Sequence, residues 1–122
     1  MAVIAPTIVD IGLTGSGYVF QVIWAAVTEN DSCRAVQYPE YADKSIQVSG
    51  TFGGASVALH GSNDGTNFAA LNDASGTVIA ITTAKIKAVL ENTFQIKPVI
   101  TGGAAQSLNV SMLIHISNPL RT

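Results

Sequence analysis

The chain has 122 residues, which is the size of one domain, and 48% of them are hydrophobic against only 11% charged. This composition excludes an intrinsically disordered chain, because disorder needs low hydrophobicity and high net charge. The formal net charge is −2 and no run of Lys or Arg occurs, which argues against nucleic-acid binding and against a polybasic membrane-surface module. We therefore expect a folded protein with a largely uncharged surface suited to contact with a partner.

Signals for a cellular compartment are few. Cys33 is the only cysteine, so it cannot form a disulfide within the chain, and nothing requires an oxidising compartment. The N-terminal segment has no basic region before its apolar residues, and Pro6 and Asp10 interrupt it, which disfavours a secretory signal. The longest apolar stretch, 19–27, is far shorter than the ~20 residues of a membrane-spanning helix. These features favour synthesis in a reducing cytoplasm.

The first third of the chain is predicted to be extended. Residues 3–11 are rich in β-branched side chains and form either the first strand of the domain or an arm that adds a strand to a neighbouring sheet. After a glycine-rich break at 12–17, residues 18–28 are apolar at odd and even positions alike. We expect this segment to be buried on both faces, inside a sandwich or against a partner chain. It is followed by a turn at 29–32, a short strand at 34–38 and a polar loop at 39–44.

Two alternating runs in the middle of the chain predict strands. Apolar and polar residues alternate over 46–52 and again over 56–61, and Gly53-Gly54 between them can adopt the positive φ angles of a tight turn. Residues 45–61 are therefore predicted to form a β-hairpin. The turn sequence Asn63-Asp64-Gly65 follows and leads to a short strand at 68–71, which completes a three-stranded meander.

The C-terminal part contains the strongest period-2 signal, over 108–116. It is preceded by an apolar run at 77–82, by a segment at 84–92 that fits a short helix or an extended connection equally well, and by a strand at 93–100. About eight short strands separated by Gly, Asn and Asp turns predict an all-β fold, an antiparallel, jelly-roll-like β-sandwich. We expect one domain, 1–122, in which 1–11 is a candidate extended N-terminal arm.

Few residues have catalytic potential. His60 and His115 fall on the polar faces of strands, and the sequence places no orienting carboxylate at a spacing that would complete a hydrolytic triad. No family signature surrounds Cys33, which fits a small buried thiol better than a nucleophile. We therefore expect no enzymatic activity.

Ligand-binding motifs are equally sparse. Asn63, Asp64 and Asp73 could supply oxygen ligands to calcium, but turn formation already explains these residues. The spacing of His and Cys matches no zinc motif, and the sequence at 15–17 lacks the lysine and the helix of a phosphate loop. We expect no metal and no cofactor.

The chain contains more aromatic and apolar side chains than one small sandwich has to bury. We expect some of them to be exposed and to contact a partner. They lie in the N-terminal segment, in the segment 18–28 and in the loop after residue 37. The candidate partner contacts are Val3, Ile4, Pro6, Ile8, Trp24, Tyr38 and Tyr41.

Two blocks of the sequence are similar to a known family. IQVSGTFGGASVALHGSNDGTNFAAL at 46–71 and ENTFQIKPVITGG at 91–103, followed by the alternating C-terminal strand, resemble a pattern of small virion proteins of tailed bacteriophages. Several proteins with this pattern are capsid decoration, or cement, proteins. The resemblance covers about 46–116, and the first 45 residues have no match.

The resemblance implies a non-enzymatic virion protein that is made in the cytoplasm of a bacterial host. Such a protein would bind the outer surface of the major-capsid lattice, bridge neighbouring subunits to stabilise the head, and form a homo-oligomer, without nucleic-acid or membrane partners. Two alternatives stay open. One is a tail, baseplate or fibre protein of a phage. The other is a discoidin-like carbohydrate-binding module, because GSNDGTNF at 61–68 is similar to a turn of the galactose-binding jelly rolls.

Overall fold

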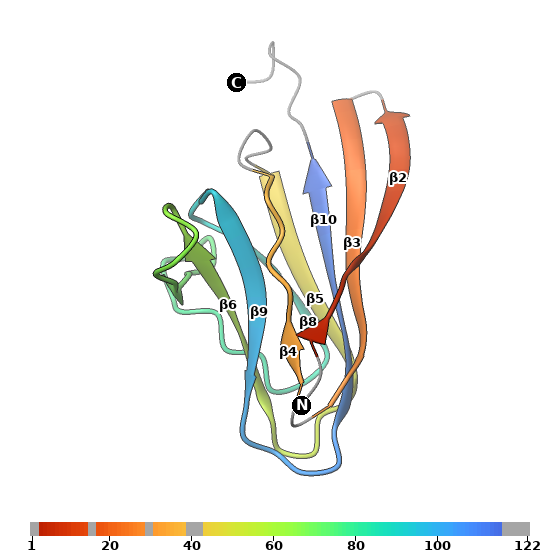
Figure 1. Cartoon of the computed structure of the whole chain (residues 1–122), viewed down its shortest axis with the longest axis vertical. Coiled ribbons are helices and arrows are strands. Elements are labelled where there is room, and N and C mark those ends of the chain that lie inside the picture. The colour runs from red at the N-terminus through yellow and green to blue at the C-terminus, as the bar shows by residue number, and fades with distance from the viewer. Residues whose placement is uncertain (1–2, 15–16, 29–30, 39–42, 116–122) are drawn as a thin grey trace.

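The computed structural model describes residues 3–14, 17–28, 31–38 and 43–115, and in these residues the chain forms two packed layers of β-strands (Figure 1). No helix occurs in this part of the chain. Almost all strand pairs are antiparallel. The predicted all-β sandwich is confirmed, with ten strands in place of about eight because three of the ten are only two residues long.

The first layer is a five-stranded antiparallel sheet. Its order is β2 (Thr7–Thr14), β3 (Gly17–Val27), β10 (Ser107–His115), β5 (Asp43–Thr51) and β8 (Lys85–Ala88). The C-terminal strand β10 therefore lies in the middle, hydrogen-bonded to β3 on one side and to β5 on the other. The strands β2 and β8 form the two edges of this sheet.

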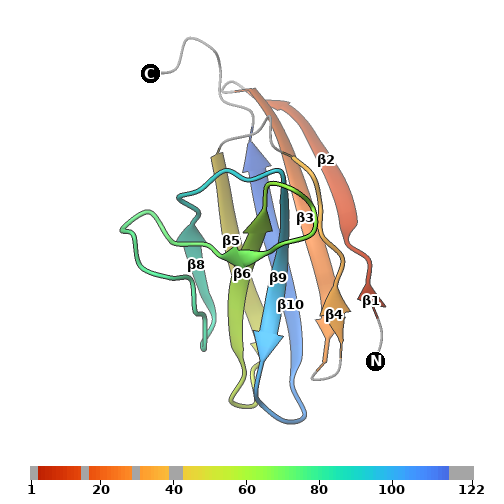
Figure 2. The same ribbon diagram turned by 60° about the vertical axis from the view of Figure 1, so that its left-hand side comes forward.

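The second layer is smaller and less regular. The strand β6 (Ser56–Ser62) pairs with β9 (Gln95–Thr101) and with β7 (Ala69–Ala70). A parallel pair, β1 (Val3–Ile4) with β4 (Ser32–Cys33), continues this layer, because Val36 bridges to Ile96 of β9. Figure 2 shows β6 and β9 in front of β5 and β10, with β1 and β4 beside them.

The core lies between the two layers and is almost entirely aliphatic. Because side chains alternate along each strand, every second residue of β5, β6 and β10 points into it. Two further isoleucines, Ile79 and Ile81, enter the core from the connection between β7 and β8. The largest fully buried side chains are Val22, Trp24, Val27, Ile46, Val48, Leu59, Ile79, Ile81, Ile96, Leu108, Met112 and Ile114.

The predicted hairpin at 45–61 is wrong. The strands β5 and β6 do not pair with each other, since β5 belongs to the five-stranded sheet and β6 to the second layer. The turn at Gly53-Gly54 therefore carries the chain from one layer to the other. A hairpin within one sheet and a crossover between two layers have the same sequence pattern, namely alternating strands on either side of a Gly-Gly turn. The pattern is the same because in both arrangements the apolar positions face one core. The later half of the meander, β6 with β7, is confirmed.

Within the molecule 18–28 is buried on one face only, so burial on both faces inside the sandwich is wrong, whereas burial of the second face against a partner chain stays a prediction. Within β3 the side chains of Val22, Trp24 and Val27 are fully buried, whereas Ile23 is half-buried and Ala26 is exposed. A β-bulge places one extra residue of β3 against β10, and Ala26 adopts a positive φ of 54° there. The bulge moves Val27 onto the core face, so apolar residues occupy odd and even positions although only one face meets the core.

The remaining segments follow the expected extended structure with shifted bounds. Residues 3–11 form β1 and the first part of β2 in their own molecule, and β2 continues to Thr14. Of the two alternatives for 84–92 the extended one is confirmed, as β8. The apolar run at 77–82 makes only isolated bridges, such as Ile81 with Val57.

Gly50 is predicted not to tolerate a side chain. Its φ is 112°, and a Cβ there would lie 2.4 Å from the backbone oxygen of Ser107 on β10. Gly12 has a comparable φ of 94° but open space around it. Both Gly50→Ala and Gly12→Ala incur roughly 1–2 kcal/mol of backbone strain. We expect urea unfolding to show a clearly larger loss of the free energy of unfolding for Gly50→Ala than for Gly12→Ala. Equal losses for the two variants would contradict the close approach of β5 to β10.

Candidate functional site

The outward face of the five-stranded sheet carries a continuous patch of uncharged side chains. Cross-strand register places the same-face residues of all five strands in rows, for example Val9, Gln21, Leu113, Ser45 and Ala88. We call this surface the uncharged sheet face. It comprises Thr7, Val9, Gln21, Ile23, Ala25, Ser45, Gln47, Ser49, Ile86, Ala88, Asn109, Ser111 and Leu113.

The uncharged sheet face mixes small polar and aliphatic side chains. Leu113 at its centre is 44% exposed and Ile86 at the β8 edge is 63% exposed. At one end it meets the carboxylate of Asp43, whose Oδ2 lies 3.7 Å from His115 Nδ1. The hydroxyl and amide side chains can donate and accept hydrogen bonds without the large desolvation cost of a buried charge.

The outward face of the second layer has a different character. His60 of β6 stands opposite Lys97 of β9, and the Lys97 Nζ lies 4.3 Å from the ring centre of Phe68. Burial and the nearby Lys97 charge lower the pKa of His60, so its imidazole is neutral at pH 7. Among the described residues the two outward faces of the sandwich therefore differ in charge, because Lys97 lies on the face of the second layer, whereas the rows across the five-stranded sheet are uncharged.

The predicted contacts of the N-terminal segment lie at one side of the sandwich. Val3 in β1 is 60% exposed and Ile8 in β2 is 43% exposed, so both are available to a partner. Ile4 packs against the core, and Pro6 between the two strands is half-buried. The structure thus brings Val3 and Ile8 to the surface but gives Ile4 a place within its own molecule.

The predicted aromatic contacts do not form one surface. Trp24 has no exposed area, and its Nε1–H donates to the backbone oxygen of Arg34 over 3.0 Å, so as a partner contact it is a wrong prediction. It fills the core because it alternates with Ile23 along β3 and so shares the core-facing side with Val22. Tyr38 is half-buried and stacks on Phe20 with ring centres 5.9 Å apart. Tyr41 lies outside the described residues.

The turn at 62–67 is held by its own side chains. The Asp64 carboxylate accepts hydrogen bonds from the backbone N–H groups of Thr66 and Asn67, from the Asn67 side chain and from the Ser62 hydroxyl. These donors, those of Asn67 above all, hold the pKa of Asp64 well below its usual range. Both carboxylate oxygens are engaged within the turn, which supports turn formation rather than calcium ligation as the reason for this sequence.

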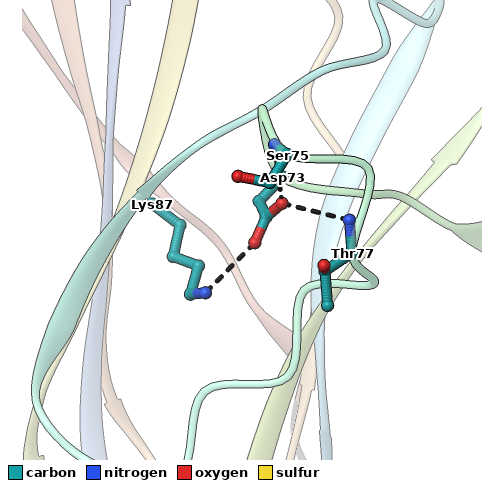
Figure 3. A network of polar contacts seen from close by, with 4 residues as sticks. All are labelled: Asp73, Ser75, Thr77 and Lys87. Atoms are coloured by element: carbon teal, nitrogen blue, oxygen red, sulfur yellow. Dashed lines mark hydrogen bonds and ion pairs between the residues drawn. The ribbon is translucent and has the colours of Figure 1, made fainter.

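A second carboxylate fixes the loop between β7 and β8 (Figure 3). Asp73 Oδ2 accepts from Lys87 Nζ at 3.1 Å, and Asp73 Oδ1 accepts from the backbone N–H groups of Ser75 and Thr77. The Lys87 ammonium, followed by the Thr77 N–H, lowers the pKa of Asp73. The loop is thereby tied to the edge strand β8.

The candidate chemical groups do not converge. His60 is in β6 of the second layer and His115 is in β10 of the first. Cys33 lines a groove of about 190 Å³ between β4 and β9, and burial, aided by the Asp31 charge, raises its pKa to about 11. The thiol is therefore protonated at neutral pH and is a poor nucleophile. The described residues contain no group of three or more His, Cys, Asp or Glu that could hold a metal ion.

Sequence reasoning did not identify the uncharged sheet face. The signal for it was present in the polar positions of the alternating strands, such as Asn109, Ser111 and Gln47, none of which is charged. That signal becomes a surface only when the strand order is known, and the order β2, β3, β10, β5, β8 joins segments from both ends of the chain. No helix in the described part of the chain is long and apolar enough to cross a membrane.

Solved structures with a similar fold include two prophage proteins. The prophage-derived protein YomS of SPBc2 is 8% identical with a TM-score of 0.62, and the match covers 79% of this chain and 93% of that protein. The exported protein XepA of PBSX is 8% identical with a TM-score of 0.51, and the match covers 84% of this chain and 38% of that protein. At these identities the likeness shows the β-sandwich fold alone. No protein-family model matches the sequence, and no curated protein matches it significantly.

The Asp73 carboxylate is predicted to stabilise the fold only while it is ionised. Its pKa is lowered on folding, so its contribution is present above the ordinary pKa of 3.8 and is lost as the pH falls through the lowered value. We expect Asp73→Asn to lower Tm at pH 7, and the difference from wild type to shrink below pH 3.8. Asp10→Asn, which removes an exposed carboxylate of β2, is the control. An unchanged Tm for Asp73→Asn at pH 7 would contradict the role of the network in Figure 3.

Proposed function

We propose that this chain is a structural protein of a bacteriophage virion, and that within the virion it is a capsid decoration protein. In this proposal it binds the outer surface of the major-capsid lattice and bridges neighbouring subunits. The uncharged sheet face is the observation that carries the proposal. The resemblance of 46–116 to phage virion proteins supports it, as does the fold shared with the two prophage proteins.

The uncharged sheet face is suited to contact with another protein. Protein interfaces are depleted of charged residues at their centres, because a buried charge without a partner is costly. Five strands ~4.8 Å apart and about seven residues of ~3.4 Å give a flat footprint of roughly 24 by 24 Å, or about 600 Å². A corrugated surface of this footprint approaches the ~800 Å² per partner of a standard interface.

Adhesion through this face requires no chemical step. Each copy would contact more than one lattice subunit, so that modest individual affinities combine through multivalency to hold neighbouring subunits together. We accordingly propose a protein without enzymatic activity.

Leu113→Asp is predicted to weaken binding to phage heads at least about tenfold, which corresponds to ~1.4 kcal/mol. The substitution places an unpaired charge at the centre of the proposed interface. The measurement is the affinity of the purified protein for heads assembled without it.

Val78→Asp is the matched control for this experiment. Val78 is 49% exposed, close to the 44% of Leu113, but it lies in the connection between β7 and β8, away from the uncharged sheet face. We expect Val78→Asp to bind like wild type. Equal binding by both variants, with both folded, would contradict the proposed contact.

The copy number in purified particles distinguishes head from tail. Quantitative mass spectrometry of the phage that encodes the protein gives the ratio of this chain to the major capsid protein. A fixed ratio with a copy number of the same order as the major capsid protein is the result expected of a decoration protein. A few to some tens of copies would assign it to the tail, and absence from particles would favour the carbohydrate-binding alternative.

A further inference from the structure

The two edges of the five-stranded sheet differ in how they are protected. The edge strand β8 has only four residues, Lys85–Ala88, and two of them are lysines. Short length and lysine are the usual means by which natural sheets prevent edge-to-edge pairing. The other edge strand, β2, has eight residues without lysine or proline, and no described strand pairs with its outer side.

Apolar side chains accompany this open edge on both faces of the sheet. Ile8 shares the core-facing side with its register partner Val22, yet it remains 43% exposed because the described part of the second layer does not cover it. Val9 lies on the uncharged sheet face, opposite Gln21, and is 39% exposed. A partner that hydrogen-bonds the outward backbone groups of β2 and covers both faces at once must itself be an extended strand.

We propose that the occupant of this edge is β2 of a second copy of the chain, paired antiparallel about a two-fold axis that passes Ile8. The axis is perpendicular to the sheet, so the two Ile8 side chains meet on the core-facing side, and Thr7 of each copy stands opposite Val9 of the other. Beyond Asp10 a register shift between Asp10 and Gly12 interrupts the regular strand and limits the pairing to the residues around Ile8.

Charge disfavours the two-fold registers whose axis lies at or next to Asp10. Asp10 is the only charged residue of β2. An axis at Asp10 would set the two carboxylates directly opposite, which is destabilising. An axis at Ile8 separates them by four residue steps of ~3.4 Å, or about 14 Å, which exceeds the Debye length of ~10 Å at 0.1 M salt.

The axis also preserves the neutral surface. Because it is perpendicular to the sheet, both uncharged sheet faces end on the same side and merge into one surface of about twice the area. Edge pairing alone, over about five residues around Ile8, is ~17 Å long and ~10 Å deep and gives a footprint of about 170 Å², well below the ~800 Å² per partner of a stable interface. The dimer is therefore weak in solution and is favoured wherever copies are concentrated side by side. The inference does not depend on which partner the sheet face binds.

Site-specific disulfide formation tests the proposal. Directly opposite residues of an antiparallel pair have Cα atoms ~4.5–5.5 Å apart, within the range that a disulfide can span. We expect Ile8→Cys to give a covalent dimer under mild oxidation, at a rate that rises with protein concentration and is at least about tenfold faster than that of Ile86→Cys on the protected edge. Wild type, with its buried Cys33, reports any background.

Three outcomes would overturn the proposal. Equal rates for Ile8→Cys and Ile86→Cys would indicate random collision, and fastest crosslinking of Leu113→Cys would indicate face-to-face pairing. Absence of a dimer at the highest concentration would leave the β2 edge unpaired. As an independent measurement, Ile8→Lys should abolish concentration-dependent association in sedimentation velocity, whereas Ile86→Lys should not change it, and an unchanged Ile8→Lys dimer would also overturn the proposal.

Discussion

The alternation of side chains along β10 is the constraint on which the rest of the structure depends. This strand lies in the centre of the larger sheet, and its even-numbered residues Leu108, Val110, Met112 and Ile114 have no exposed area. Its odd-numbered residues form the middle of the uncharged sheet face. One strand thus supplies the core on one side and the proposed contact surface on the other, so a shift of one residue in its register would exchange the two.

The close approach of turns to strands explains part of the sequence block that resembles phage proteins. Gly50 lets the end of β5 pass against the backbone of β10, and a side chain at Gly53 would strike the backbone oxygen of Ala104 in the turn before β10. The same two turns carry the chain between the layers. The glycines of the block are therefore required by the way in which the two layers are joined.

The sequence predicted the fold class and most strands because alternation is a local property. It predicted β10, β6 and β9 within a few residues, and the turn at Asn63-Asp64-Gly65. It failed where the answer depended on distant partners. The turn between β5 and β6 does not reveal that β5 pairs with β10 rather than with β6, and the bulge at Ala26 that turns Val27 inward arises from pairing with β10. The candidate surface was missed for the same reason.

The central claim is that the uncharged sheet face meets the capsid. Hydroxyl-radical footprinting of the protein, free and on phage particles, tests it most directly, because it reports the accessibility of individual side chains. The account predicts that Leu113 loses reactivity on the particle, while Leu90 and Phe94, exposed outside the uncharged sheet face, keep theirs. Retained reactivity of Leu113 together with protection of Phe94 would contradict it.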